Sequence, residues 1–429
     1  MFYSFDNASF LFAFGTIFFL TIVPFFDFKQ SKYTFTLPLV GAVALVFFGY
    51  RTAAVSAISI FVLWVYLKNN FKLQLAVIAL GICLVTFFIK SGSTSGRWFI
   101  IKRTIEILRD NPNGIGFGNF KVVYGLHQAH YFKSHFINDT IALGADNTEF
   151  ALNEYLQVAI EGGIFQGAVF LLFTILLLFV GFKVYKLKQQ KILLAFMTGF
   201  TALSFANLWF YMLHNYWVLT FYIICVLGIY LFLIFNKRTA TSFSFCAGLI
   251  LISITLFKNY KSNFLKKKLE TASTLSSVGY KSYADSVFKS VNDDSLNVDY
   301  QLIMANHCLR YNNPEQAILE MEKVNKQITN DGNYLLTGDA YLALGDTLNA
   351  IKYYLTAIYS VPKRFSSRKK LANVYQQTND RVKEIYWLQS IINLPEKVPS
   401  KITKQIKEEA QQRLIEIAQP KSANDRQYM

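Results

Sequence analysis

The stretch IFQGAVFLLFTILLLFVGF, residues 164–182, decides the class of fold. It contains no charged residue, and about 20 mostly apolar residues are enough for a helix to cross a membrane. Seven further segments have the same character, so the sequence predicts an all-α protein with about eight membrane spans. The other segments lie at residues 8–26, 34–49, 52–67, 71–89, 192–213, 216–235 and 242–257.

The composition also points to a membrane protein. Hydrophobic residues make up 53% of the chain and charged residues 16%, whereas a soluble domain is about a quarter charged. Residues 1–257 carry 18 Lys and Arg against 9 Asp and Glu, and residues 258–429 carry 25 against 18. This shift predicts a membrane domain followed by a soluble domain.

Lysine and arginine are concentrated in short loops at residues 27–33, 68–70, 183–191 and 236–241. Such loops mark the cytoplasmic side, so the 90–160 loop and the C-terminal part are predicted to lie outside. Lysines at 258–268, directly after the last span, oppose this orientation, and loss of the 242–257 span would invert the C-terminal part.

The 90–160 loop is the one long polar segment of the membrane domain. It begins with SGSTSG, expected to be flexible, and an amphipathic helix is predicted over residues 98–111, before Pro112. Gly114, Gly116 and Gly118 follow. Without a preceding strand they cannot form a nucleotide-binding turn, and two interpretations stay open: a tight turn, or backbone that approaches a phosphate or sugar.

Three of the five histidines of the chain lie in this loop, at His127, His130 and His135. Their spacing fits no zinc signature, so no metal or other cofactor is expected. They are either solvated side chains or a general base.

Acidic residues gather at the end of the same loop. Their concentration at one surface of the bilayer indicates a polar pocket, although helix capping would also explain them. They are Asp146, Glu149, Glu154 and Glu161.

Arg51 stands between two apolar segments, where a charge costs about 2.5–3.5 kcal/mol. It either extends to the interface or forms an anion site with Arg97. Guanidinium groups match phosphate oxygens well, so the second interpretation suits a lipid-linked pyrophosphate.

Together these motifs resemble the O-antigen ligase and polymerase superfamily of bacterial membrane glycosyltransferases. The resemblance covers residues 34–235 and depends on the order of the motifs. They are GYRTA at 49–53, SGR at 95–97, DNPNGIGFGNF at 110–120, NEYLQ at 153–157, and EGGI at 161–164 with Gly167.

The resemblance implies transfer of a glycan from an undecaprenyl-pyrophosphate carrier, at the periplasmic face of the bacterial inner membrane. The acceptor would be lipid A-core, a growing glycan or a protein. Arg51 and Arg97 would bind the pyrophosphate and stabilise it as a leaving group. The candidate pocket comprises Gly116, Gly118, Asn147, Asn153, Glu154, Gln157 and Glu161.

Two features depart from the family. Leu152 occupies the position of the family's proposed base, a histidine, so His130, Asp146 and His127 are the candidate replacements; a mechanism without this base and an inactive protein are the alternatives. Members also usually have more than eight spans, which suggests that N-terminal helices are missing here.

After a linker at 258–274, residues 275–420 are predicted to form tetratricopeptide-like helical repeats, followed by a tail at 421–429. Small residues and tyrosines recur where paired helices would cross, and a proline stands at the exit. Such repeats usually bind a peptide or protein, and a cap without a partner is the alternative. No nucleic-acid partner is expected outside the cell. The characteristic residues are Tyr334, Gly338, Tyr341, Ala350, Tyr354, Ala357 and Pro362.

The sequence thus favours a membrane glycosyltransferase. The first alternative is a non-catalytic, membrane-anchored repeat scaffold for cell-envelope proteins, which the leucine at position 152 supports. A transporter is less favoured, because it would need ionisable residues within several spans.

Overall fold

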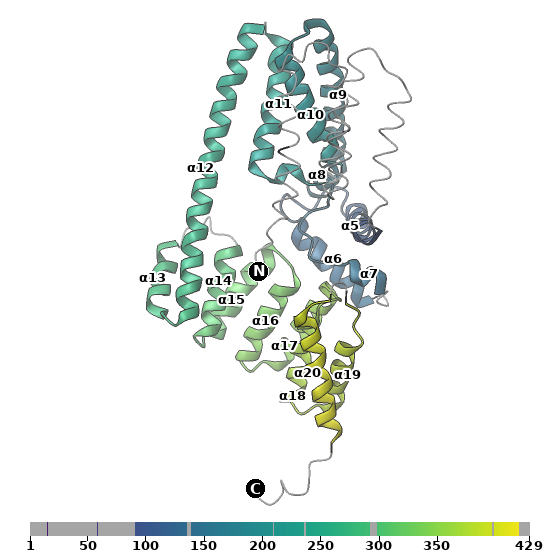
Figure 1. The fold of residues 1–429 in the computed structure, drawn as a ribbon, viewed down its shortest axis with the longest axis vertical. Helices are drawn as coiled ribbons and strands as arrows, with labels where there is room; N and C mark the ends of the chain where they lie inside the picture. Colours follow the sequence, from purple (N-terminus) through teal and green to yellow (C-terminus); the bar gives the residue numbers. More distant parts are fainter. Residues whose placement is uncertain are drawn as a thin grey trace, which may run out of the picture. The chain divides into compact units, whose positions relative to one another are not determined.

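The computed structural model describes residues 15, 58, 91–134, 139–208, 210–235, 237–291, 298–396 and 399–419. Over these residues the protein is all-α, with 16 α-helices and a short 3₁₀ helix, η3 (Figure 1). The four predicted spans between residues 8 and 89, together with Arg51 and His135, lie outside the described residues, apart from Gly15 and Ile58.

The described helices fall into two compact units. Unit 1 comprises residues 1–97, 104–117 and 150–264, and unit 2 comprises residues 98–103, 118–149 and 265–429. The outer loop therefore contributes to both. The first helices along the chain are α5 (Ser91–Asp110), α6 (Phe120–Ser134), α7 (Asp139–Gly144), α8 (Glu154–Gly162), α9 (Ile164–Lys188), α10 (Lys191–Ala206), η3 (Met212–His214), α11 (Tyr216–Ile234) and α12 (Lys237–Val278).

Unit 1 is built around α9, α10 and α11, which pack against one another. Small residues allow the close approach: a Cβ atom at Gly181 would overlap Met197, and one at Gly228 would overlap the ring of Phe196. Close packing at small residues is the usual way in which membrane helices associate. Most of the remaining surface of α9 is apolar and exposed.

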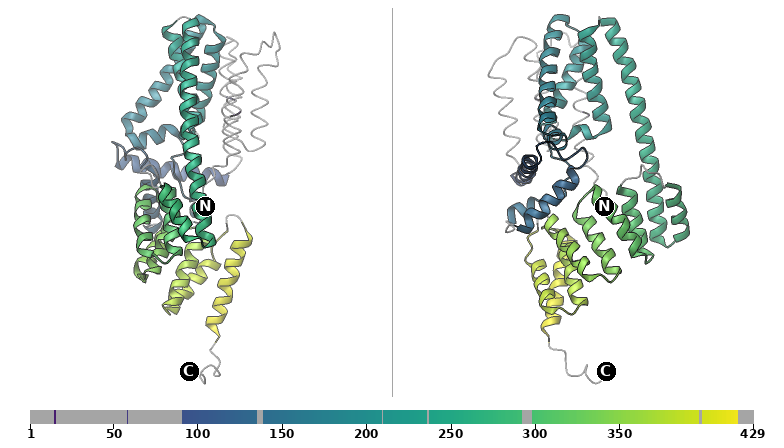
Figure 2. Two further views of the ribbon diagram at one scale, coloured as in Figure 1. Left: turned by 90° about the vertical axis from the view of Figure 1, so that its left-hand side faces the viewer. Right: turned by 180° about the vertical axis from the view of Figure 1, so that it is seen from behind.

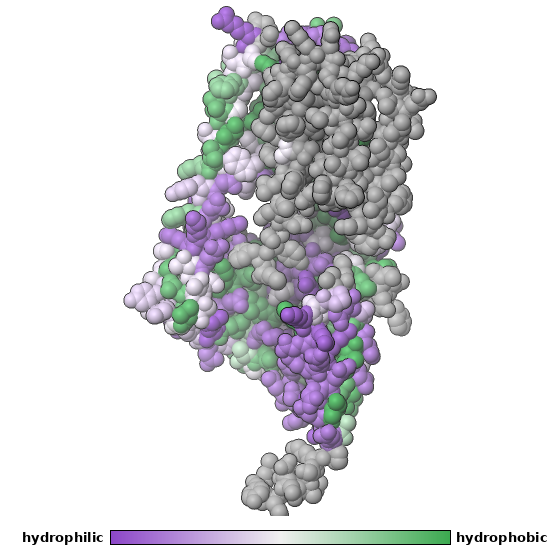
Figure 3. Space-filling model, viewed as in Figure 1, coloured by the Kyte–Doolittle hydropathy of each residue, from purple (hydrophilic) through white to green (hydrophobic). Residues whose placement is uncertain are grey.

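Among the described residues, three helices are long and apolar enough to cross a membrane: α9, α11 and the part of α12 from Arg238. The predicted spans at 164–182, 216–235 and 242–257 are thus helical, and the chain is associated with a membrane. In the view of Figure 3, hydrophobic side chains follow the membrane-domain part of α12, and the helices toward the C-terminus are mostly hydrophilic.

The predicted span at 192–213 is shorter than expected. Helix α10 ends at Ala206 after 16 residues, which gives about 24 Å at 1.5 Å per residue, less than the roughly 30 Å of a bilayer core. Asn207 follows it as the C-cap, and the carbonyl of Asn207 accepts a hydrogen bond from Glu154 N, at 2.8 Å.

Two connecting segments are more regular than predicted. SGSTSG, expected to be flexible, forms the first turns of α5, and the predicted helix over 98–111 continues it to Asp110. Helix propensity is a weak prior that the surrounding fold overrides. The linker at 258–274 is likewise helical, because α12 continues through it to Val278.

Unit 2 contains successive helix pairs, each packed on the next (Figure 2). The predicted crossing point is confirmed: a Cβ at Gly338 would lie 2.5 Å from the ring of Tyr354, which is fully buried. The helices are α13 (Lys281–Val291), α14 (Val298–Arg310), α15 (Pro314–Gln327), α16 (Asp331–Ala343), α17 (Thr347–Ser360), α18 (Phe365–Gln377), α19 (Arg381–Ile392) and α20 (Lys401–Ala418).

The turns inside three of these pairs repeat the same geometry. A residue with positive φ, at Asn312, Gly345 and Asn379, is followed by an N-cap residue whose side chain accepts a backbone N–H: Asn313, Asp346 and Asp380. These turns recur after 33 and 34 residues, a regular spacing of the kind found in solenoids.

Helix α6, from the outer loop, also belongs to unit 2 and packs on α17. Thr329 Oγ1 donates to the carbonyls of Lys121 and Val122, at 3.1 and 3.0 Å. A Cβ at Gly125 would overlap Thr329 Oγ1 and lie 2.8 Å from its carbonyl oxygen. Glycine at position 125 therefore permits this contact.

Candidate functional site

The start of α8 is fixed to the end of α10. Asn153 is the N-cap of α8, and its side chain accepts from Leu156 N at 2.9 Å and donates to Leu208 O at 2.9 Å. The neighbouring Glu154 N donates to Asn207 O. The cap of α8 is therefore Asn153, a residue type favoured at this position, and not one of the acids for which capping was considered.

One face of α8 is polar and buried. Glu154, Gln157 and Glu161 are 4%, 2% and 8% exposed, and their spacing of three and four residues places them on the same side of the helix. Gln157 Nε2 donates to Glu161 Oε1 at 2.8 Å, and its Oε1 accepts from Ala151 N at 2.7 Å. The three predicted pocket residues on this helix are therefore buried, and two of them, Gln157 and Glu161, are hydrogen-bonded to each other.

The glycine turn closes over the other end of α8. The backbone N–H groups of Ile115 and Gly116 donate to the carbonyls of Ile160 and Glu161, both at 2.9 Å. These carbonyls are among the last of the helix and would otherwise lack partners. The φ angles of Gly114 and Gly116 are +88° and +89°, as expected for a tight turn.

Gly114 makes the closest approach. A Cβ there would lie 2.5 Å from both Glu161 O and Gly163 N. Gly163 itself has φ +98° and separates α8 from α9. Of the two interpretations of the glycines, the tight turn is confirmed, and the backbone that they approach belongs to the chain itself.

His214, which the sequence did not single out, lies beside Glu154. Its Nδ1 is 3.5 Å from Glu154 Oε1, and the two side chains are 31% and 6% exposed. Glu154 Oε2 also accepts from Leu213 N at 3.4 Å. A buried carboxylate thus contacts a histidine that solvent reaches.

Aromatic rings surround His214. The ring centroids of Phe150 and His214 are 4.2 Å apart, and Phe150 stacks on Tyr211 at 4.3 Å. Phe210 in turn stacks on Tyr211 at 4.6 Å. The sequence held a signal for this cluster, because aromatic residues and a histidine fill the short turn between two apolar segments.

Leu152, at the position expected to hold histidine, has a φ of +57°. This left-handed conformation costs a non-glycine residue about 1–2 kcal/mol. It is the last residue before the N-cap of α8, so the strained backbone sets the direction in which the chain enters the helix.

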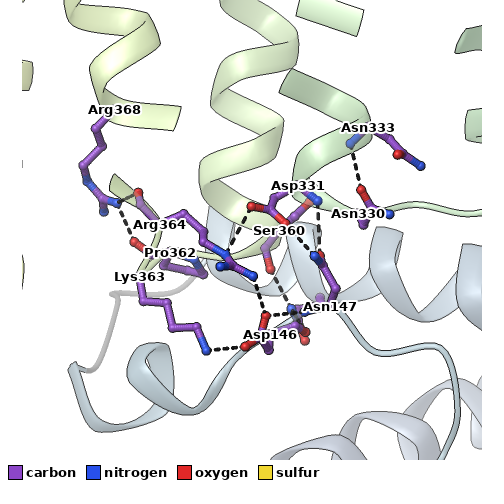
Figure 4. Close-up of polar contacts among 11 residues, drawn as sticks. Asp146, Asn147, Asn330, Asp331, Asn333, Ser360, Pro362, Lys363, Arg364 and Arg368 are labelled. Carbon is purple, nitrogen blue, oxygen red and sulfur yellow. Dashed lines mark hydrogen bonds and ion pairs between the residues drawn. The ribbon is translucent and has the colours of Figure 1, made fainter. Parts of the chain in front are cut away.

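Asp146, a predicted base, belongs to unit 2 and is bound by two cations (Figure 4). Lys363 Nζ lies 2.6 Å from Oδ2, and Arg364 Nη2 lies 3.0 Å from Oδ1. Burial alone would raise the pKa of Asp146, but the hydrogen bond and charge of Lys363 and the charge of Arg364 outweigh it and lower the pKa. A lowered pKa makes this carboxylate a weak base.

Asn147 extends the same contact. Its Nδ2 donates to Asp331 Oδ1 at 2.5 Å, and its Oδ1 accepts from Asp331 N at 3.1 Å. Gln128 Nε2 donates to the carbonyls of Ser360 and Asp146, at 2.6 and 3.2 Å. The Asp146–Asn147 segment therefore fastens the outer loop to the turns that join successive helix pairs (Figure 4).

The remaining predicted site residues are dispersed. His127 is half-buried and His130 is exposed, both on α6 in unit 2. Gly118 lies in the open turn before α6, where a Cβ would have no heavy atom within 4 Å. Arg97 is half-buried on α5. Its predicted partner Arg51 is outside the described residues, so the pyrophosphate pair stays a prediction.

No protein-family model matches the chain, and no curated protein matches it.

Proposed function

We propose that the protein is a membrane glycosyltransferase that moves a glycan from a polyprenyl-pyrophosphate carrier to an acceptor hydroxyl at the outer face of the bacterial inner membrane. The observation that carries this proposal is the buried polar face of α8, formed by Glu154, Gln157 and Glu161. Buried carboxylates are costly and cluster at functional sites. This face directly precedes α9, a helix able to span the membrane.

An unsatisfied polar group adds support. The side chain of Asn207 is fully buried, and neither its Nδ2 nor its Oδ1 makes a hydrogen bond within the part of the chain that is described. Such a group calls for a partner. Asn207 adjoins Glu154 through its backbone, so this unpaired amide lies next to the buried polar face of α8.

In this proposal Arg97 and Arg51 bind the pyrophosphate and stabilise the negative charge that grows on it as it leaves. The membrane domain has about eight spans. The helix pairs of unit 2 are tetratricopeptide-like repeats that bind an acceptor or a partner protein, and their recurrent turns support this assignment. The enzyme needs no cofactor for this chemistry.

The test is transfer of a labelled glycan by cells that lack the gene and carry the full chain or a variant. Arg97→Ala should reduce transfer at least about 100-fold, because removal of a group that stabilises developing charge costs 10²–10³. Arg97→Lys keeps the charge but loses the forked geometry, so its transfer should lie between those of the wild type and Arg97→Ala. Wild-type transfer by Arg97→Ala at equal abundance would overturn this role.

The acceptor is identified in the same cells. A shift in lipopolysaccharide banding indicates lipid A-core or a glycan, and loss of glycoprotein staining indicates a protein. A non-catalytic scaffold, which Leu152 still favours as the second function, would leave the lipid-linked glycan pool unchanged on deletion. An enzyme would leave that pool enlarged.

A further inference from the structure

The proposed transfer needs a group to accept the proton of the acceptor hydroxyl, and Leu152, at the position of the family's base, cannot accept one. Of the three predicted replacements, Asp146 is ion-paired with Lys363 and Arg364, and its pKa is lowered. His127 and His130 lie on α6, in unit 2. A hydroxyl is a weak nucleophile without a base, which typically contributes 10²–10⁴-fold to the rate.

We infer that His214 is the general base of the proposed transferase and that Glu154 is its positioning residue. This inference rests on the proposed function. His214 is the only histidine within the sequence ranges of unit 1, the unit that holds α8 and the helices able to span the membrane.

The pair has the geometry of a base and the carboxylate that orients it. Glu154 Oε1 lies 3.5 Å from His214 Nδ1, longer than a catalytic hydrogen bond of about 2.6–3.2 Å, and such contacts often tighten only when substrate binds. A carboxylate beside Nδ1 places the imidazole proton there and leaves Nε2 as the acceptor. No hydrogen bond joins Nε2 to any residue among those described.

The carboxylate is itself held in place. Glu154 occupies the first turn of α8, with its backbone N–H bound to Asn207 O and its Oε2 bound to Leu213 N. Its side chain is 6% exposed, whereas the His214 side chain is 31% exposed. Glu154, the orienting group, is therefore held in place and shielded from solvent, whereas His214, the base, is accessible to a substrate.

The aromatic surroundings suit an acceptor site. Phe150 and Tyr211 stack together beside His214, so aromatic rings form an apolar wall next to the imidazole. Ligand sites commonly combine such apolar walls with a few fixed polar groups. Phe150 and Tyr211 would thus line the acceptor site while Nε2 meets the hydroxyl.

The step balances without another reactant. The acceptor oxygen bonds to C1 of the donor sugar as the bond from C1 to the diphosphate oxygen breaks. The electron pair of that bond leaves with the polyprenyl diphosphate, and the hydroxyl proton passes to His214 Nε2. The imidazolium then gives the proton to the diphosphate or to water.

The experiment measures glycan transfer in spheroplasts of the deletion strain, whose outer face is open to added imidazole. The probe is the cells' own lipid-linked glycan, labelled by a pulse of radioactive sugar. His214→Ala should reduce the rate of label transfer at least about 100-fold, and imidazole should restore part of it. Tyr216→Phe, an exposed residue in the next turn, is the matched control and should keep the wild-type rate.

Variants of Glu154 test the positioning role. Glu154→Gln should lower the maximal rate about 10-fold with little change in KM for the lipid-linked donor. Glu154→Asp should retain more activity than Glu154→Gln, because it keeps the charge that orients the imidazole. A merely structural role would favour the isosteric Gln. His214→Gln replaces His214→Ala if the latter is not made at normal abundance.

The outcomes separate this inference from the proposed function. If the wild type transfers label and Arg97→Ala does not, while His214→Ala stays within twofold of the wild type, the inference is overturned and the proposed function stands. Loss of activity in His214→Ala without any recovery in imidazole also overturns it. If the wild type transfers no label, both the inference and the proposed function are overturned.

Discussion

Two carboxylate clusters that are near neighbours in the sequence have opposite surroundings. Asp146, in unit 2, is held by Lys363 and Arg364. Glu154, in unit 1, is more deeply buried and contacts an imidazole and a backbone N–H. The contrast separates a carboxylate whose ion pairs fasten a loop to a helical array from one that lies beside an imidazole, and the proposal assigns a positioning role to the second.

The largest effect on stability is expected at Gly114, where the glycine turn lies against the end of α8. Gly114→Ala would place a Cβ 2.5 Å from the backbone of Glu161 and Gly163 at a φ of +88°. Since neither backbone can move freely, we expect a loss of about 4 kcal/mol or more. The measurement is the midpoint of heat-induced aggregation of the full chain in detergent.

Gly118→Ala is the matched control. Gly118 has a φ of +80°, but its Cβ would meet no heavy atom within 4 Å. Only the conformational cost remains, about 1 kcal/mol. Equal destabilisation by the two variants would contradict the close approach of Gly114 to α8.

A smaller effect is expected at the polar network of α8. Gln157→Met keeps the shape of the side chain but removes the bonds to Glu161 and Ala151. The buried Ala151 N–H loses its partner, so we expect a loss of about 2–3 kcal/mol. Thermal aggregation in detergent is again the measurement, and a variant as stable as the wild type would show that the network contributes little.

The smallest effect is expected at Asp146. Asp146→Asn removes the charge that pairs with Lys363 and Arg364, but 41% of the Asp146 side chain is exposed, so solvent screening limits the loss to about 1 kcal/mol. Amide hydrogen exchange over residues 139–149 should show roughly fivefold faster opening at pH 7.

The pH dependence distinguishes the two acids further. The pKa of Asp146 is lowered in the folded chain, so its stabilisation is fully present above the usual value near 3.8 and is lost as the pH falls through the lower folded value. The difference between wild type and Asp146→Asn should therefore disappear in acid well below pH 4. A difference that persisted there would show that the ion pairs are not its source.

Much of the fold could be predicted from the sequence, because the length of an apolar segment and the spacing of a repeat are local properties. The helices at 164–182 and 216–235, the glycine turn and the crossing of Gly338 with Tyr354 follow from them. Helix α10 was predicted too long, and the contact at its C-cap, between Asn207 and Glu154, joins residues far apart in the sequence.

Less of the candidate site could be predicted from the sequence. Glu154, Gln157 and Glu161 could be found from their spacing along one helix. His214 could not, because its contact with Glu154 joins residues 60 positions apart. The ion pairs of Asp146 were hidden for the same reason, since Lys363 and Arg364 lie more than 200 positions further along the chain.

The left-handed backbone at Leu152 has a consequence for engineering this corner. The entry into α8 is set by main-chain torsion and by the cap at Asn153, and not by contacts of a particular side chain at position 152. Glycine, which adopts a positive φ without strain, should therefore be accepted there and leave the carboxylates that follow in place.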